Sequence, residues 1–289
     1  MSALDDPQPP QASPSSGDSR LHLPLTGPDM SFHHFFPDGP MPVPAREILR
    51  DLLPAKAVKR CPPVTAASSF GWLLFPPTSF AVRWVKDGLE FTLIDDDGTC
   101  GSWELLGADR PGRHPRTDAA LAGVPQHRRD DLLASLDEIG VPLVDPNPAD
   151  PREFQIITGV TARTARGWAS LVRPIPNLPV PPQTHDVVDG IVETAWYGNG
   201  LPVMVRLRAR DEVVRFSASN PIAAIQPIPV AAFATENSQA ATSQSGIGNW
   251  PDDEWERFVA TRRQRLDPLP GSYRRAMHAY HREPEPEVD

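Results

Sequence analysis

Short apolar runs separated by glycine, proline and asparagine follow one another from residue 154 to residue 229. Apolar or alternating runs of this length, bounded by turn-forming residues, are typical of β-strands rather than helices. Because proline interrupts strand pairing and fixes turns, we expect these segments to lie side by side in one layered sheet. The predicted strands are at residues 154–161, 167–173, 187–197, 201–208, 212–217 and 222–228.

A second group of predicted strands precedes this stretch, at residues 32–36, 71–75, 80–85 and 89–94. Phe80, Val82 and Trp84 occupy alternate positions, which gives their strand one strongly apolar face. The dipeptide Asp87-Gly88 predicts a tight hairpin between the last two strands, because short hairpin turns need the positive φ that glycine adopts easily.

Helices are predicted at four segments, which are residues 45–53, residues 128–139, a helix that begins at Pro251, and residues 271–281. In the first, Ile48 and Leu49 share an apolar face and Pro54 ends the helix. In the third, Trp255 and Phe258 lie on one face, so we expect this helix to dock against another surface.

These elements predict a mainly β protein: an antiparallel β-sandwich, jelly-roll-like, with a C-terminal helical segment. The sandwich is expected at residues 31–232, with a helical or loop insertion at about residues 95–150. Residues 1–30 are poor in large apolar side chains and are predicted to be a disordered leader. Residues 233–249 have the composition of a linker, and residues 250–282 are expected to form helices that pack on the sandwich.

Composition narrows the function classes. The chain has 289 residues, 36 of them proline, and a formal net charge of −9, which argues against a general nucleic-acid binder. No run approaches the roughly 18 apolar residues that span a membrane. The N-terminal residues also lack the apolar core of a signal peptide. We therefore expect a cytoplasmic protein that binds neither nucleic acid nor membrane.

Cysteine and histidine give no strong chemical signal. Cys61 and Cys100 are too few for a disulfide framework, and we expect reduced, partly buried thiols. A disulfide or a reactive Cys100 remains an alternative, although the sequence places no cation or base beside that thiol. The eight histidines include no H-x-H pair, and the only H-x-E is His281 to Glu283. The glycine-rich phosphate loops and the G-x-S-x-G nucleophile motif are missing too, so we expect no metal site and leave the cofactor unknown.

The most suggestive constellation combines arginine, glutamate and tryptophan within otherwise apolar strands. One interpretation is structural, with an arginine–glutamate pair that ties strands together. The other is a pocket in which Arg163 or Arg173 holds a ligand carboxylate against Trp168 or Trp196. The candidate ligand-binding residues are Arg163, Trp168, Arg173, Asn177, Glu193 and Trp196.

Five stretches carry a resemblance to a known family: RCPPVTAASSFGWLLFPPTSFAVRW, RTARGWASLVRPIPN, GIVETAW, VVRFSASNPIAAIQPIP and the C-terminal aromatic helix. In this order they resemble a bacterial family that is catalogued only as a domain of unknown function. The resemblance covers roughly residues 55–280, with gaps at residues 95–150. It implies a soluble bacterial protein of predominantly β structure and brings no activity with it. The Ser/Pro leader and the Arg/Pro connection at residues 107–130 are not features associated with the family.

Two function classes follow from these patterns. The first is a small-molecule protein, either a binding module or an enzyme without a signature motif, that uses the arginine, glutamate and tryptophan residues. The second is an interaction or scaffold protein without catalytic activity, which presents its sheet or its C-terminal helix to a partner protein. A concave pocket containing several of the candidate side chains favours the first class. Dispersed or paired side chains, together with an exposed apolar patch elsewhere, favour the second.

Overall fold

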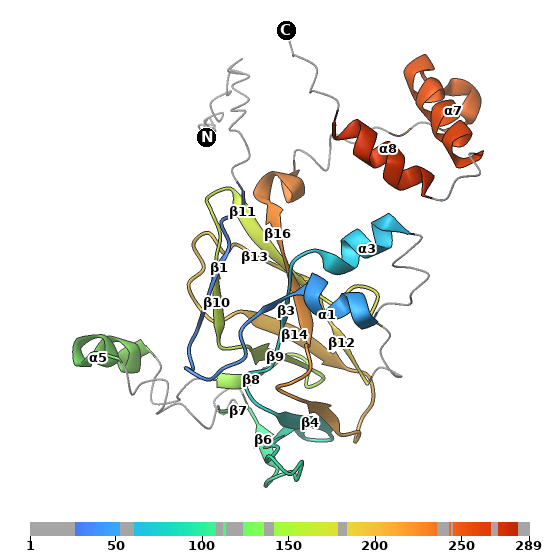
Figure 1. Ribbon diagram of the computed structural model, residues 1–289. Coiled ribbons are helices and arrows are strands. Elements are labelled where there is room, and N and C mark those ends of the chain that lie inside the picture. The colour runs from blue at the N-terminus through green and yellow to red at the C-terminus, as the bar shows by residue number, and fades with distance from the viewer. Residues whose placement is uncertain are drawn as a thin grey trace, which may run out of the picture.

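The computed structural model describes residues 27–52, 61–107, 112–113, 124–135, 142–178, 184–235, 243, 245–266 and 271–282. The protein is mainly β and antiparallel, with a few helices that include the C-terminal ones (Figure 1). Residues 1–26 of the predicted leader lie outside the described residues, as do parts of the predicted linker and the end of the helix predicted at residues 128–139.

The strands are β1 (Ser31–His34), β2 (Val43–Pro44), β3 (Trp72–Leu74), β4 (Phe80–Val85), β5 (Gly88–Leu93), β6 (Glu104–Leu106), β7 (Gly112–Arg113), β8 (Pro142–Pro146), β9 (Glu153–Ile157), β10 (Val160–Arg163), β11 (Trp168–Arg173), β12 (His185–Val187), β13 (Gly190–Val192), β14 (Pro202–Leu207), β15 (Val214–Phe216) and β16 (Ala223–Pro229). The helices are α1 (Ala45–Leu52), α3 (Pro62–Ser69), α5 (Gln126–Ser135), η1 (Val230–Phe233), η2 (Ile247–Asn249), α7 (Asp252–Leu266) and α8 (Ser272–Tyr280).

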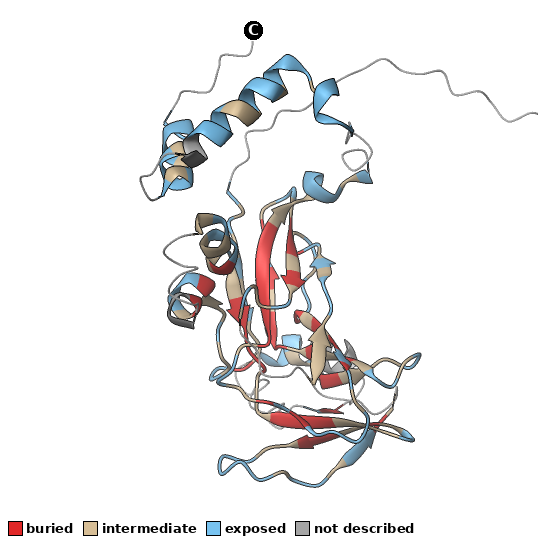
Figure 2. Cartoon of the chain, turned by 90° about the vertical axis from the view of Figure 1, so that its right-hand side faces the viewer, coloured by how far each residue is buried: buried red, intermediate tan, exposed pale blue. Residues whose placement is uncertain are grey.

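The described strands form four antiparallel sheets around a shared core. Their strand orders are β1-β10, β13-β11-β16-β3-β2, β12-β14-β9-β8-β7 and β15-β4-β5-β6. Buried side chains from all four sheets belong to one hydrophobic cluster, for example Ala162, Ile225, Phe154 and Phe80. Figure 2 shows the buried positions running along the strands in the middle of the molecule. The layers therefore pack face to face, as the predicted sandwich requires.

Strand β16 explains why the sequence near residue 225 is almost continuously apolar. It lies between β11 and β3, so neither of its edges is free. Ala223 and Ile225 belong to the large core cluster, whereas Ala224 packs with Leu49 of α1 on the opposite face. A strand covered on both faces has no polar face to display. The exception, Gln226, is buried and donates its Nε2–H to the carbonyl of Phe70 at 3.0 Å.

The hairpin predicted at Asp87-Gly88 is confirmed. Strands β4 and β5 pair from Phe80 opposite Leu93 to Val85 opposite Gly88, which leaves a two-residue turn. Gly88 has a φ of 149°, in the range that favours glycine, so the sequence pattern and the backbone agree.

Two segments predicted as single strands are each divided. The segment at residues 154–161 breaks into β9 and β10 at Gly159, whose φ is 72°. The segment at residues 187–197 contains the last residue of β12 and the whole of β13. A turn at residues 194–196 follows β13. The prediction that Glu193 and Trp196 lie within a strand is therefore wrong, because both residues follow β13. The alternating pattern missed this because residues at strand ends and turns share the same composition.

The region at residues 95–150, predicted as a helical or loop insertion, contributes strands as well as helix α5. Strand β6 pairs with β5, and β8 pairs with both β7 and β9. These strands are short and carry proline or charge, so their apolar period is too brief to recognise in the sequence.

The two C-terminal helices, α7 and α8, contact each other. Trp250, Trp255 and Phe258 form an aromatic group on α7, with ring centroids 5.3 Å and 5.9 Å from that of Phe258. Figures 1 and 2 draw both helices beyond the end of the sheets that carries η1. Packing of these helices on the sandwich stays a prediction.

Candidate functional site

The six residues predicted to bind a ligand lie at the two ends of β11. Arg163, Trp168, Glu193 and Trp196 belong to the end where the strand begins, and Arg173 and Asn177 belong to the other. The two ends of a six-residue strand are about 17 Å apart. One small pocket therefore does not hold all six side chains.

Three buried hydroxyl groups hold the first of these groups together. The Thr194 hydroxyl lies 2.9 Å from the Thr164 hydroxyl and 2.8 Å from the Ser170 hydroxyl. Thr164 also donates to the carbonyl of Trp168 at 3.1 Å, and its backbone N–H donates to the carbonyl of Thr194 at 3.3 Å. This cluster fastens the turn after β13 onto the start of β11. Sequence reasoning missed it because a lone threonine in a strand carries no signal of its partners.

Glu193, Arg173 and Asn177 of the candidate set each lie near a different residue, although the buried Nε of Arg173 has no hydrogen-bond partner among the described residues. The indole N–H of Trp196, whose side chain is 73% exposed, donates to the Glu193 carboxylate. Arg173 lies with its Nε 3.9 Å from Asp189 Oδ1, and Asn177 donates to the Ser68 hydroxyl at 3.0 Å. The structure thus pairs these residues separately, and a ligand site at Arg163, Trp168, Glu193 and Trp196 stays a prediction.

A polar cavity of about 690 Å³ lies elsewhere, beside β15. It is formed by four chain segments: the turn after β1, the loop between β3 and β4, the loop after β5, and β15 with its following turn. Its lining residues are Asp38, Pro40, Pro77, Thr78, Ser79, Ile94, Asp95, Asp96, Gly98, Arg215, Phe216, Ser217, Ala218 and Asn220. Eight of these side chains are polar or charged, so the cavity presents hydrogen-bonding groups to any occupant.

The loop after β5 places two carboxyl groups at this cavity. The backbone N–H of Asp95 donates to the carbonyl of Thr99 at 2.9 Å, and that of Gly98 donates to the carbonyl of Asp95 at 2.9 Å. Gly98 has a φ of 84°, which favours glycine. The backbone N–H of Thr99 donates to Asp97, which lowers the pKa of that carboxyl group. Asp97 therefore closes the turn, while Asp95 and Asp96 face the cavity.

Contacts between distant segments fix the opposite wall. Arg215 Nη1 donates to the carbonyl of Gly98 at 3.1 Å, and the Ser79 hydroxyl accepts the backbone N–H of Ala218 at 3.1 Å. These bonds join residues more than 100 positions apart in the chain. The wall is thus set by tertiary structure.

The floor of the cavity is part of the hydrophobic core. Phe216 is 3% exposed, and its ring stacks on Phe80 with a centroid distance of 5.0 Å. His185 of β12 packs on Phe216 with its centroid 5.0 Å away, and burial lowers the pKa of its imidazole. A neutral imidazole therefore lies next to Phe216, because the charged form is disfavoured away from water.

Sequence reasoning assigned residues 95–98 to a connection and did not find this cavity. A local signal existed, since three consecutive aspartates followed by glycine form a polar turn directly after an apolar strand. Nothing in the sequence of residues 215–220 indicates that they lie beside residues 95–98. Only the pairing of β15 with β4, and of β4 with β5, brings the two segments together.

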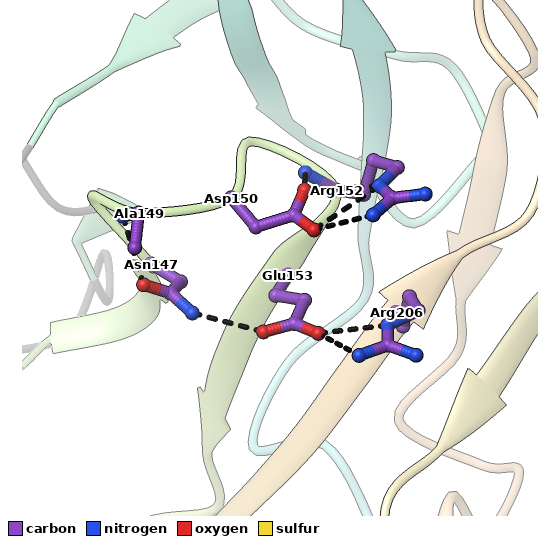
Figure 3. A network of polar contacts seen from close by, with 6 residues as sticks. All are labelled: Asn147, Ala149, Asp150, Arg152, Glu153 and Arg206. Carbon is purple, nitrogen blue, oxygen red and sulfur yellow. Dashed lines mark hydrogen bonds and ion pairs between the residues drawn. The ribbon is translucent and has the colours of Figure 1, made fainter.

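A second charged region lies on β9 and β14 (Figure 3). Arg206 is paired with Glu153 across the two strands, and Asn147 donates to the same carboxylate at 2.9 Å. Arg152 forms an ion pair of 2.6 Å with Asp150, and its hydrogen bonds lower the pKa of that carboxyl group to about 2. The Arg206 side chain likewise lowers the pKa of Glu153. We call these five residues the β9–β14 ion network.

In the β9–β14 ion network each charge contacts an opposite charge. The neighbouring Arg208 continues the pattern, because its Nε donates to Asp186 at 2.9 Å and holds the pKa of that carboxyl group low. Such exposed pairs are typical structural features of a sheet surface. Within the described part of the chain, by contrast, neither Asp95 nor Asp96 has a side-chain hydrogen bond or ion pair.

Comparison with known proteins does not name the site: no family model matches the chain, and a search of curated proteins finds no relative. The resemblance to an uncharacterised bacterial family accordingly stays a prediction. Within the ranges given above, no three His, Cys, Asp or Glu side chains are grouped so that they hold a metal ion. In the same residues, no helix is long and apolar enough to cross a membrane.

Proposed function

We propose that the protein binds a small polar molecule in the cavity beside β15. The observation that carries the proposal is the cavity itself, because its volume of about 690 Å³ lies within the range of about 300–1,000 Å³ that is usual for small-molecule sites. The wall is fixed by the hydrogen bond that Arg215 donates and the one that the Ser79 hydroxyl accepts, so most of it exists before a ligand enters. A preformed site loses little ordering entropy on binding.

The lining indicates the ligand's chemistry. The carboxylates of Asp95 and Asp96 accept hydrogen bonds, and Ser217 and Asn220 both donate and accept them. Ile94 and Phe216 contribute the apolar part. We therefore expect a compact molecule with several donor groups, such as hydroxyl or amino groups, on a small carbon framework. The bacterial, cytoplasmic setting expected from the sequence would make such a ligand a metabolite.

A thermal-shift screen of polar metabolites tests this proposal, because a ligand that binds only the folded state raises Tm. The hit is then titrated by calorimetry against Asp96→Asn and Ala218→Phe, which remove a charge from the cavity and fill it. Asp87→Asn is the matched control, since Asp87 lies in the exposed β4–β5 turn at the other end of the same sheet. We expect both cavity variants to lose at least about tenfold in affinity and the control to keep it. A hit that binds all variants equally would place the site elsewhere.

The second function class rests on a different observation. Trp255 is 45% exposed, Tyr273 is 56% exposed and Tyr280 is 75% exposed, all on the C-terminal helices. Aromatic side chains gathered on an exposed surface are typical of protein interaction sites. An interaction function through α7 and α8 is therefore proposed beside small-molecule binding, and the two do not exclude each other.

A further inference from the structure

An aromatic groove runs along α8. Tyr273, Met277 and Tyr280 are spaced at intervals of four and three residues, which places them on one helical face. They line a cavity of about 460 Å³ together with Thr261 from α7 and with Ser272, Ala276 and His281. The two tyrosine rings stay largely exposed beside it. We call this feature the α8 groove.

The surroundings of the α8 groove are basic, although the whole chain carries a formal net charge of −9. Residues 257–282 contain seven arginines and a single acidic residue. Arg262, Arg263, Arg274, Arg275 and Arg282 are all exposed. The groove therefore lies in a strongly basic part of the chain, with Arg262 next to the lining residue Thr261 and Arg274 next to Tyr273 in the sequence. It fits an occupant that has apolar, compact side chains and negative charges.

Residues 283–289, which follow α8 directly, have this composition. They read EPEPEVD, with four carboxylates, two prolines and no basic residue. Proline and the residue before it favour the extended polyproline II conformation. Aromatic grooves bind proline in this conformation, because the conformation is preformed and the ring stacks on an aromatic face. The three glutamates next to these prolines, Glu283, Glu285 and Glu287, carry a charge opposite to that of the arginines of residues 257–282.

The geometry allows this segment to reach the groove. The helix ends in a turn at residues 281–282, where the backbone N–H of Arg282 donates to the carbonyl of Ala279 at 3.0 Å. Seven extended residues span about 22 Å, and nine helical residues span about 14 Å. A short tether also gives an effective concentration in the millimolar range, so a weak contact is sufficient for occupancy.

We infer that the α8 groove binds residues 283–289 of the same chain, with prolines on Tyr273 and Tyr280 and carboxylates at the surrounding arginines. A partner protein that docks through an acidic, proline-bearing segment must displace them. This inference rests on the interaction function proposed above and is independent of the cavity beside β15. Residues 283–289 then compete with a partner protein for the α8 groove, so only a partner that binds more tightly than this segment occupies it.

The test uses a fluorescently labelled peptide of sequence EPEPEVD and the chain ending at Arg282, measured by anisotropy at low salt. We expect saturable binding to the shortened chain and at least about tenfold weaker binding to the full chain, because the tethered copy competes. Tyr280→Ala in the shortened chain should weaken binding, whereas Tyr197→Ala, which is not among the residues that line the groove, should not. Added salt should weaken binding as well.

A second variant avoids dependence on truncation. In the full chain, Glu283→Gln, Glu285→Gln and Glu287→Gln together should open the groove to the labelled peptide as the truncation does. Equal binding to full and shortened chains, or no binding to the shortened chain at millimolar peptide, would overturn the inference. A third outcome is that the full chain binds the peptide more weakly as the protein concentration rises and forms dimers in sedimentation. Residues 283–289 would then bind a second copy of the chain, which would contradict the intramolecular contact.

Two further probes separate this inference from the broader interaction function. A proline-free acidic peptide that binds the shortened chain while EPEPEVD does not would overturn the assignment of the occupant and leave an interaction function intact. If an oligo-dT binds the shortened chain and neither peptide does, the groove is a nucleic-acid site. That result would overturn both the assignment of residues 283–289 and the protein-interaction function. Ligand binding in the cavity beside β15 should be the same in all these variants.

Discussion

The β9–β14 ion network and the cavity beside β15 are both rich in charge, yet they differ in what the charges contact. In the network, Arg152 and Arg206 are held by Asp150 and Glu153 at the surface of a sheet. In the cavity, Arg215 contacts a backbone carbonyl while Asp95 and Asp96 face open volume. In the network the charged groups therefore bind one another, whereas in the cavity the carboxyl groups of Asp95 and Asp96 can form hydrogen bonds with another molecule.

This difference teaches how to weigh charged residues in a sequence. The arginine, glutamate and tryptophan residues attracted attention because they interrupt apolar strands. The structure pairs Glu193 with Trp196, and Arg173 lies beside Asp189. Most polar residues of the cavity instead lie in turns and loops, where polar residues are expected in any case. Charge therefore points to a ligand only where the surrounding structure leaves it without a protein partner.

The largest expected effect comes from breaking the cavity floor. Phe216→Ala removes a ring that contacts Phe80, Phe154 and His185 in the core. Substitutions of this kind cost about 3–5 kcal/mol, so urea unfolding should show a large loss of stability. Val213→Ala, at an exposed position in the same segment, should change the free energy of unfolding by less than about 0.5 kcal/mol. Similar losses for the two variants would contradict the assignment of Phe216 to the core.

A smaller effect is expected at the hydroxyl cluster that holds the other candidate region. Thr194→Val keeps the shape of the side chain but leaves the Thr164 and Ser170 hydroxyls without this partner. Unsatisfied buried polar groups cost about 1–3 kcal/mol. The loss should appear in chemical unfolding, and Thr161→Val, at a half-buried position on β10, serves as the control. An unchanged stability would show that water replaces the lost hydroxyl.

Mild acid should distinguish the buried imidazole from the surface network. His185 has a folded-state pKa below the usual value of about 6.5. The unfolded chain therefore binds more protons below this pH, so stability falls as pH drops from about 6.5 toward the folded-state pKa. The slope for one such site is at most about 1.4 kcal/mol per pH unit. His185→Gln should reduce the slope, and a residual slope is expected from His34, whose pKa is also lowered by burial.

The β9–β14 ion network should respond only at lower pH. Its carboxyl groups have lowered pKa values, to about 2 for Asp150. The stability that they contribute is complete above their unfolded pKa of about 4 and is lost as pH falls toward the folded-state value. Because the pairs are exposed, Glu153→Gln should have the smallest effect of these variants at pH 7. A loss as large as that of Phe216→Ala would mean that the network is not a surface feature.

The sequence was sufficient to predict much of the fold. Antiparallel strands, the hairpin at Asp87-Gly88 and the C-terminal helices follow from local period and turn chemistry. Breaks at Gly159 and after Val192 were missed, because a strand end and a turn have the same residue types. Strands β6, β7 and β8 were missed because they are too short to show a period.

The candidate site was harder to predict than the fold. A cavity arises from segments that are distant in the chain, and its existence depends on the sheet order and on the register of β15 with β4. In the sequence, residues 95–98 look like part of an ordinary connection and residues 215–220 like the end of a strand and its following turn. Conversely, Glu193 looked unusual in the sequence and has an ordinary partner in the structure, the indole N–H of Trp196.

The most direct test of this account is calorimetric titration of the ligand found by the thermal-shift screen against Asp96→Asn and Glu153→Gln. The two substitutions remove the same charge, one from the cavity and one from the β9–β14 ion network. We predict that Asp96→Asn weakens binding by about tenfold or more and that Glu153→Gln leaves the Kd unchanged. Equal Kd values for both variants and the unmodified protein would contradict the proposal that the cavity beside β15 is the binding site.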